Sequence, residues 1–175
     1  MTASGITIER LDTAGAMAAA PVLSGILIDC VAGGAGVNFM HPLTSEKALA
    51  YWRDEVVPAV SSGNTALLVA RRDGRLAGTV QLILAMRENQ PHRGEIAKLL
   101  VAPRARRQGV ARALMQAAHD HAAAADKTLL VLDTADDGAE RLYRSLGWQT
   151  VGVVPGFALT PHGALCATTF LYKTL

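Results

Sequence analysis

The strongest chemical signal in the sequence is a basic loop, Ala-Pro-Arg-Ala-Arg-Arg-Gln-Gly-Val-Ala-Arg, at residues 102–112. It contains four arginines and no acidic residue. Gly109 and Ala111 leave room for a ligand near the backbone, and the first N–H groups of the following helix have no partner within that helix. These features predict a site for a pyrophosphate, with a solvated basic turn as the alternative. The loop has neither the glycine pattern of a dinucleotide site nor that of a nucleotide P-loop.

The elements around this loop must position it. An apolar stretch at 95–102, stopped by Pro103, predicts the strand before the loop. Helical spacing of apolar residues predicts the helix after it, from Val110 to Ala125. Its expected apolar stripe consists of Val110, Ala113, Leu114, Ala117, Ala118 and His121. Upstream, Asp73-Gly74 separates two apolar runs and predicts a hairpin with a type I′ turn.

The rest of the chain predicts further strands and helices. Strands are expected at 6–11, 129–132, 150–154 and 165–172, the second of these buried on both faces. Helices are expected at 13–31, from a cap at Thr44 or Ser45 to about 56, and at 137–146 before Gly147. Pro58 is expected to kink or end the second of these helices. The order β-α-α-β-β-β-α-β-α-β-β indicates one mixed α/β domain over residues 1–175.

Composition excludes several classes of function. Half of the 175 residues are hydrophobic, which is enough for a sizeable core. A net charge of +2 and an aromatic content of 5% do not favour nucleic-acid binding. We find no apolar run near the roughly 20 residues of a membrane helix and no signal-peptide pattern, so we expect no membrane association and a cytoplasmic location.

Neither the cysteines nor the histidines form a pattern typical of a disulfide or a metal site. Cys30 and Cys166 are far apart in the sequence and predict reduced thiols. His119 and His121 are two residues apart on one predicted helix and would point to different faces, and the other histidines are single loop residues. No Cys/His cluster is present in the sequence, so we expect no metal site.

Three spaced motifs resemble the GNAT (GCN5-related N-acetyltransferase) family. Arg106-x-x-Gly109-x-Ala111 resembles the family's Arg/Gln-x-x-Gly-x-Gly/Ala motif, residues 100–103 resemble its fourth strand, and residues 142–148 its late Tyr-x-x-Leu-Gly-Phe segment. Residues 33–40, 132–134, 154–157 and 173–175 are similar to the tabtoxin-resistance branch. The resemblance implies a mixed α/β fold with a twisted, mostly antiparallel sheet of about seven strands, a V-shaped split and about four flanking helices.

The resemblance also implies acetyl-CoA as the acetyl donor. Backbone N–H groups from Arg106 to Ala111 would hold the pyrophosphate, and a strand N–H group near Leu99 would polarise the thioester carbonyl. The implied cofactor-binding residues are Leu99, Leu100, Val101, Arg106, Arg107, Gln108, Gly109, Val110, Ala111 and Arg112.

Three residues are candidates for proton transfer. The resemblance implies that Tyr143 protonates the departing thiolate, although its ring could instead only pack. Asp133 ends an apolar strand and could bind the substrate ammonium or act as base, or it or Thr134 could cap the next helix. Glu95 matches a glutamate base of histone-acetylating relatives, or is an exposed edge residue.

The expected reaction is transfer of an acetyl group to a primary amine of a small molecule, such as a toxin-like amino acid, by direct attack in a ternary complex. Asn38 and Phe39 would border the acceptor pocket, with packing into the core as the alternative for Phe39 and Met40. The alternatives are a protein N-terminal or lysine acetyltransferase and an acyl-CoA-binding sensor without turnover. The last two predicted strands are suited to form a homodimer.

Overall fold

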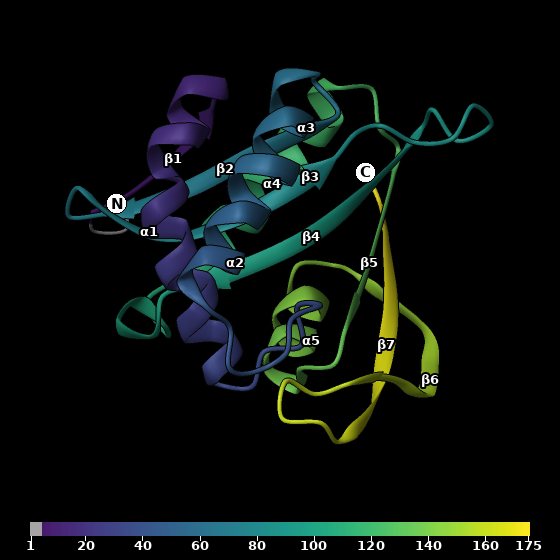
Figure 1. Ribbon diagram of the computed structural model, residues 1–175. Coiled ribbons are helices and arrows are strands. Elements are labelled where there is room, and N and C mark those ends of the chain that lie inside the picture. The colour runs from purple at the N-terminus through teal and green to yellow at the C-terminus, as the bar shows by residue number, and fades with distance from the viewer. Residues whose placement is uncertain (1–4) are drawn as a thin grey trace.

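The computed structural model describes residues 5–175 (Figure 1). The first four residues, which the predicted domain includes and on which the expected absence of a signal peptide partly depends, lie outside this range. The sheet has the order β1-β2-β3-β4-β5-β7-β6, and of its neighbouring pairs within the described residues only β4 and β5 are parallel. Its strands are β1 (Ile6–Leu11), β2 (Thr65–Arg72), β3 (Arg75–Ile83), β4 (Arg93–Val101), β5 (Leu129–Thr134), β6 (Gln149–Leu159) and β7 (Leu165–Thr174).

Helices cover both faces of the β1–β4 half of the sheet, with α1, α2 and α3 in front and α4 behind in Figure 1. The helices are α1 (Thr13–Ala32), α2 (Ser45–Ala50), the π-helical η1 (Tyr51–Val56), α3 (Val57–Ser61), the 3₁₀ turn η2 (Pro103–Ala105), α4 (Val110–Ala124) and α5 (Asp137–Ser145). Because α2, η1 and α3 follow one another without a break, four main helical segments flank the sheet in the described chain. The predicted fold class is therefore confirmed.

The sheet splits between β4 and β5. These strands pair only at Arg93–Leu129, Gly94–Leu130 and Glu95–Val131, after which β4 continues with β3 alone and β5 with β7 alone. Figure 1 shows the two strands diverging below this point. The predicted V-shaped split is thus present, and its apex is at Glu95.

A bulge lies in β4 beside the split. Gln81 of β3 is opposite Ala97, and Thr79, two residues earlier, is opposite Leu100, so β4 has one residue more than its partner over this interval. Within the bulge Lys98 has φ 52°, a left-handed conformation that is costly for a residue with a Cβ. Bulges commonly redirect a side chain beside a functional site.

Local sequence signals were accurate at the turns and caps. Asp73 and Gly74 have φ values of 49° and 78°, as a type I′ turn requires, and Gly147 after α5 has φ 84°. Thr44 is the N-cap of α2, and its hydroxyl accepts from the Lys47 N–H. Pro58 does not end the helix, which continues to Ser61; instead the wider η1 turn precedes it, since proline has no N–H to donate.

Two predicted patterns of burial are wrong. On α4 the buried set includes Met115, His119 and Ala122, whereas His121 is only half-buried, because His119 packs against Trp148 in the segment between α5 and β6. In β5 only Leu130 and Leu132 are fully buried. On the other face of β5, Leu129 and Val131 are half-buried and Asp133 is exposed, so only one face of this strand is fully covered.

The statement that no apolar run approaches membrane-spanning length is also wrong. α1 has 20 residues and a mean hydropathy of 1.8 over its most apolar window, so by length and composition it could cross a membrane. Half of that window is buried inside the protein. Ala20, Leu23, Leu27 and Val31 have no exposed surface, because α1 packs on the sheet as a core helix.

Candidate functional site

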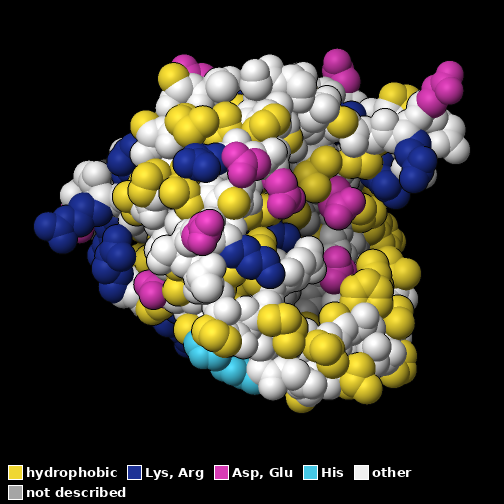
Figure 2. Space-filling model, in the orientation of Figure 1, with side chains coloured by type: hydrophobic (Ala, Val, Ile, Leu, Met, Phe, Trp, Pro, Cys, Tyr) yellow, Lys and Arg dark blue, Asp and Glu magenta, His cyan; other side chains and the backbone are white. Residues whose placement is uncertain are grey.

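A cavity of about 870 Å³ opens where β4 and β5 separate. It is lined by the loop after α1, by β4, by the basic loop and the start of α4, by the end of β5, and by α5. The predicted site residues on its wall are Asn38, Glu95, Leu99, Leu100, Val101, Arg106, Arg107, Gly109, Val110, Ala111, Arg112, Asp133 and Tyr143. The structure thus brings together residues from distant parts of the sequence. Figure 2 shows acidic and basic side chains around the central hollow.

One end of the cavity is suited to an anion. Gly109 has φ 85° and precedes α4, whose N-terminus has no side-chain cap. A Cβ at Gly109 would meet only the Ile6 Cδ1 atom, at 3.9 Å, so the backbone is open to a ligand. The free N–H groups of the first turn of α4 and the Arg107 side chain therefore fit a pyrophosphate.

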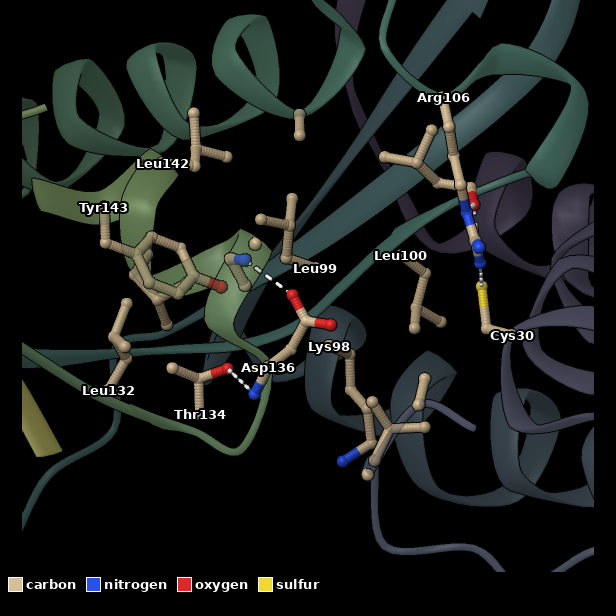
Figure 3. Close-up of a pocket in the computed structure, with 18 of the residues that line it drawn as sticks. Cys30, Lys98, Leu99, Leu100, Arg106, Leu132, Thr134, Asp136, Leu142 and Tyr143 are labelled. Carbon is tan, nitrogen blue, oxygen red and sulfur yellow. Dashed lines mark hydrogen bonds between the residues drawn. The ribbon is translucent and has the colours of Figure 1, made fainter. Parts of the chain in front are cut away.

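The arginines of the loop have different roles. The Arg106 Nε atom donates to the Val101 carbonyl, and its Nη2 atom lies 3.7 Å from the Cys30 Sγ atom (Figure 3). The Arg112 Nη2 atom donates to the Ser145 hydroxyl at 2.7 Å and so links α4 to α5. Burial raises the pKa of the Cys30 thiol, which keeps it protonated and unreactive.

Two polar side chains of the basic loop, those of Arg104 and Gln108, point away from the main cavity. The Gln108 Nε2 atom donates to the Arg104 carbonyl, and the Arg104 Nη2 atom donates to the Leu76 carbonyl. Both residues line a second, smaller cavity together with Arg72 and Arg75. Of the predicted cofactor residues, Gln108 is therefore the one whose side chain lies away from the main cavity.

The floor of the cavity is the part of β4 beyond the split. From Ile96 to Val101 the side of β4 that faced β5 has no partner strand within the described residues. Its backbone groups can therefore pair with an extended chain that carries amides, as a further strand would. The predicted contacts of Leu99, Leu100 and Val101 with a pantetheine chain fit this geometry.

Tyr143 reaches this floor from α5. Its ring is buried beside Trp148, with a centroid separation of 6.0 Å, and its hydroxyl points into the cavity towards Leu99 (Figure 3). Burial first, and then the carboxylates of Asp136 and Asp133, raise the pKa of the Tyr143 hydroxyl. The hydroxyl therefore stays protonated at neutral pH and is available as a hydrogen-bond donor.

Asp133 does not cap α5, as one interpretation of the sequence had it. The cap is Asp136, whose carboxylate accepts from the Ala139 N–H at 2.6 Å, and Thr134 accepts from the Asp136 N–H. Asp133 is exposed and accepts a 3.0 Å hydrogen bond from the Thr168 hydroxyl of β7. This bond fixes one carboxylate oxygen at the wall of the cavity.

Glu95 is not an edge residue. It lies opposite Ile83 on one side and Val131 on the other, in the middle of the sheet, and is half-buried. Its position is the last pair before the strands diverge, so it lines the cavity at the apex of the split.

The loop after α1 contributes unequally to the wall. Asn38, with φ 71°, lines the cavity, whereas Phe39 is half-buried outside the lining and packs edge-on against the Tyr51 ring at 5.2 Å. Met40 is 45% exposed, so it does not fill the core. Phe39 therefore supports the wall through Tyr51.

Three residues at or near the cavity were not among the predicted site residues, namely Lys98, Tyr51 and Glu55. Lys98 lines the cavity, and its Nζ atom lies 5.8 Å from the centre of the Tyr51 ring. Burial lowers the pKa of Lys98, while the nearby carboxylates of Asp133, Glu55 and Glu95 act in the opposite direction. A lysine between apolar neighbours in a central strand was the available signal.

The loop histidines are not all separate. His41 and His162 come from different ends of the chain, and their ring centres are 5.0 Å apart. Within residues 5–175 there is no group of three or more His, Cys, Asp or Glu side chains that could hold a metal ion.

Comparisons with known proteins agree with this geometry. The family described as "Acetyltransferase (GNAT) family" matches residues 36–148. A curated relative from Azospirillum brasilense, described as an uncharacterized N-acetyltransferase in the hisH-hisA intergenic region, is 32% identical over 133 residues, which cover 75% of this chain and 76% of the relative.

Solved structures share the fold. A GCN5-related N-acetyltransferase from Kribbella flavida superimposes with a TM-score of 0.79 at 22% identity, covering 98% of each chain. A phosphinothricin acetyltransferase from Sinorhizobium meliloti, solved in complex with acetyl-CoA, gives a TM-score of 0.78 at 18% identity, covering 98% of this chain and 89% of that one.

Proposed function

Because this chain belongs to the GNAT family of acetyl-CoA-dependent N-acetyltransferases, we propose that it acetylates a primary amine of a small molecule by direct attack in a ternary complex. The observation that carries the proposal is the single cavity that joins the anion-binding loop to the open side of β4 and to the acceptor side at Glu95, Lys98 and Asp133. Donor and acceptor can therefore meet at the split.

The chain's own groups suit the donor. Acetyl-CoA supplies the acetyl group as a thioester, and transfer forms an N–C bond and breaks a C–S bond. The N-terminus of α4 with Arg107 would hold the pyrophosphate, and Leu99 to Val101 would pair with the pantetheine amides. A β4 N–H group aimed at the thioester oxygen would stabilise the negative charge that develops there by roughly 3 kcal/mol.

We assign the two proton transfers to two side chains on the β5–α5 side of the cavity. Tyr143, protonated and directed towards Leu99, donates a proton to the leaving sulfur. Asp133 takes a proton from the acceptor ammonium, directly or through a water, and the neutral amine that results attacks the thioester carbonyl. Asp133 is the carboxylate whose charge reaches both Tyr143 and Lys98, which supports a place between the donor and acceptor ends. Glu95 then contributes attraction for the cationic amine.

The acceptor side favours a small molecule over a protein. Residues 33–38 of the loop after α1 line the cavity and close one side of it. A peptide acceptor would need an open groove at this side, and the loop obstructs it. A toxin-like amino acid remains our proposed acceptor class, as in the tabtoxin-resistance branch that the sequence resembles. A protein acetyltransferase and an acyl-CoA sensor are the alternatives.

We treat residues 1–175 as one catalytic domain in the cytoplasm, and we propose a homodimer formed at β6. This strand is an edge of the sheet and exposes Val151, Val153 and Phe157. Hydrophobic side chains gather along this side of the molecule (Figure 2). Light scattering gives the molar mass of wild type and of Val153→Lys, and we expect a dimer for wild type and a monomer for the variant. A monomeric wild type would contradict the proposed dimer.

The central experiment measures thiol release from acetyl-CoA in the presence of a panel of small amines, with acetyl-CoA binding followed by calorimetry. Turnover with any small amine supports the proposed function. Tight binding without thiol release from any amine would favour the sensor, and release only with peptides would favour the protein acetyltransferase. No binding of acetyl-CoA would overturn the assignment of the cavity.

A further inference from the structure

Lys98 is a partly buried cation without an ion-pair partner. None of the ion pairs within residues 5–175 includes it, although three carboxylates are near enough to influence it. The carboxylates of Glu55 and Asp133 are exposed to solvent and Glu95 is half-buried, so water screens much of their attraction. A desolvated ammonium in a ligand cavity, with no direct partner, is an incomplete site.

The surrounding structure holds Lys98 in place. Its left-handed backbone conformation in the β4 bulge turns this residue out of the regular strand pattern. The Nζ atom lies over the Tyr51 ring, and Tyr51 is fixed by a 2.9 Å hydrogen bond from the Gln81 amide to its hydroxyl and by the edge of Phe39. Tyr51 in turn belongs to the π-helical turn η1, an irregularity often found at functional sites.

Lys98 points to the acceptor side of the cavity. Figure 3 shows its side chain leaving β4 on the side away from the Arg106–Cys30 contact. The α4 N-terminus and Arg107, which suit the pyrophosphate, follow the end of β4, whereas Lys98 lies within that strand, between Glu95 at the apex of the split and Val101. Its charge is therefore available to the acceptor and not to the phosphates of the donor.

We propose that Lys98 determines acceptor choice by pairing with a carboxylate of the acceptor, so that the preferred acceptors carry an amine and a carboxylate a few bonds apart. The inference rests on the proposed function and narrows its substrate class. The cation lies in the cavity wall with carboxylates around it, so a zwitterion can place its anionic group on Lys98 and its ammonium against Asp133 or Glu95. A simple amine would leave the Lys98 charge unpaired and would be repelled by it.

The test compares matched acceptors with and without the carboxylate. Thiol release is measured for alanine and ethylamine, phenylalanine and 2-phenylethylamine, and lysine and 1,5-diaminopentane, giving a ratio of kcat/KM for each pair. We expect wild type to favour the amino acid in at least one pair by about tenfold or more, as one charge-assisted contact would give. Lys98→Met should reduce that ratio to near one, mainly by raising KM for the amino acid.

Two further variants separate charge recognition from a structural role. Lys98→Arg retains the cation and should retain most of the selectivity. Lys47→Met removes an exposed lysine outside the cavity and should leave the ratio as in wild type. Calorimetric affinity for acetyl-CoA shows whether each variant is folded.

The outcomes for this inference differ from those for the proposed function. Thiol release with a wild-type preference for the simple amines, or a carboxylate preference that survives in Lys98→Met, would overturn the role of Lys98 and leave the acetyltransferase standing. Acetyl-CoA binding without thiol release for any of the six acceptors or for any peptide would overturn both.

Discussion

Trp148 donates its indole N–H to the Nε2 atom of His119 over 3.0 Å, in a buried contact that joins α4 to the segment between α5 and β6. The indole also packs beside Tyr143. Burial, together with the nearby Lys173 ammonium, lowers the pKa of His119 to about 4, which keeps its Nε2 atom unprotonated and able to accept. Because Trp148 also contacts the Tyr143 ring, this hydrogen bond helps to hold in place the proposed acid, Tyr143.

We therefore expect stability to fall on mild acidification. The unfolded chain takes up a proton on His119 near its usual pKa of 6.5, whereas the folded protein takes it up only near pH 4. The stabilisation is complete above pH 6.5 and is lost between about pH 6.5 and 4, with about 2 kcal/mol gone between pH 7.5 and pH 5. Urea unfolding of wild type and His119→Gln at both pH values measures this. An equal fall in both proteins would contradict it.

Gly109→Glu should weaken acetyl-CoA binding by at least about tenfold, because it adds a carboxylate where the α4 N-terminus faces phosphate and places a side chain at a left-handed position. Gly63→Glu is the matched control. Gly63 also has a positive φ, 74°, with no atom near its ideal Cβ, but lies outside the cavity. Calorimetry measures the acetyl-CoA affinity of both variants. Equal losses of affinity would show that the added charge or the backbone strain acts without any specific effect at Gly109.

Tyr143→Phe should reduce kcat about tenfold or more while changing acetyl-CoA affinity little, since it removes one proton donor from a buried ring and keeps its packing. Because the raised pKa keeps the hydroxyl protonated through neutral pH, the pH profile of kcat should show no loss of activity from Tyr143 below pH 10. Steady-state kinetics from pH 6 to 10 tests both statements. Wild-type turnover in the variant would remove Tyr143 as the acid.

Asp133→Asn should lower kcat/KM more than Glu95→Gln, by about tenfold or more, if Asp133 is the base and Glu95 only attracts the amine. The reverse pattern would exchange their roles. Thr168→Val removes the hydroxyl that donates to Asp133, and its kcat/KM should lie between those of wild type and Asp133→Asn.

Gly78→Ala should destabilise the protein by about 1–3 kcal/mol. Its Cβ would lie 2.7 Å from the Leu100 carbonyl oxygen and 3.1 Å from the Val110 side chain, so β4 or the start of α4 would have to move. Denaturant unfolding measures the loss. A variant as stable as wild type would show that the neighbouring backbone adjusts freely.

Local signals in the sequence were sufficient for most of the fold. The type I′ turn at Asp73-Gly74, the cap at Thr44 and the stop at Gly147 depend on backbone conformations that particular residue types favour, so they appear in the sequence itself. The basic loop before α4 was also identifiable, because its arginines, its glycine and its position between a strand and a helix are all local features of the sequence.

Tertiary structure decided the rest of the candidate site. Whether the Arg106 or the Gln108 side chain faces the cavity depends on the carbonyl to which it donates, Val101 for Arg106 and Arg104 for Gln108. Likewise the extra residue in β4 follows from pairing with β3, and no local pattern marks it.

The sequence by itself determined the elements, their order and the basic loop between β4 and α4, because these follow from short-range propensities and periodicity. Only the folded structure determined that Lys98 lies over Tyr51, that Asp133 is held by Thr168, and that Glu95 is at the apex of the split. These relationships join residues far apart in the chain, and their energies come from burial and long-range contacts.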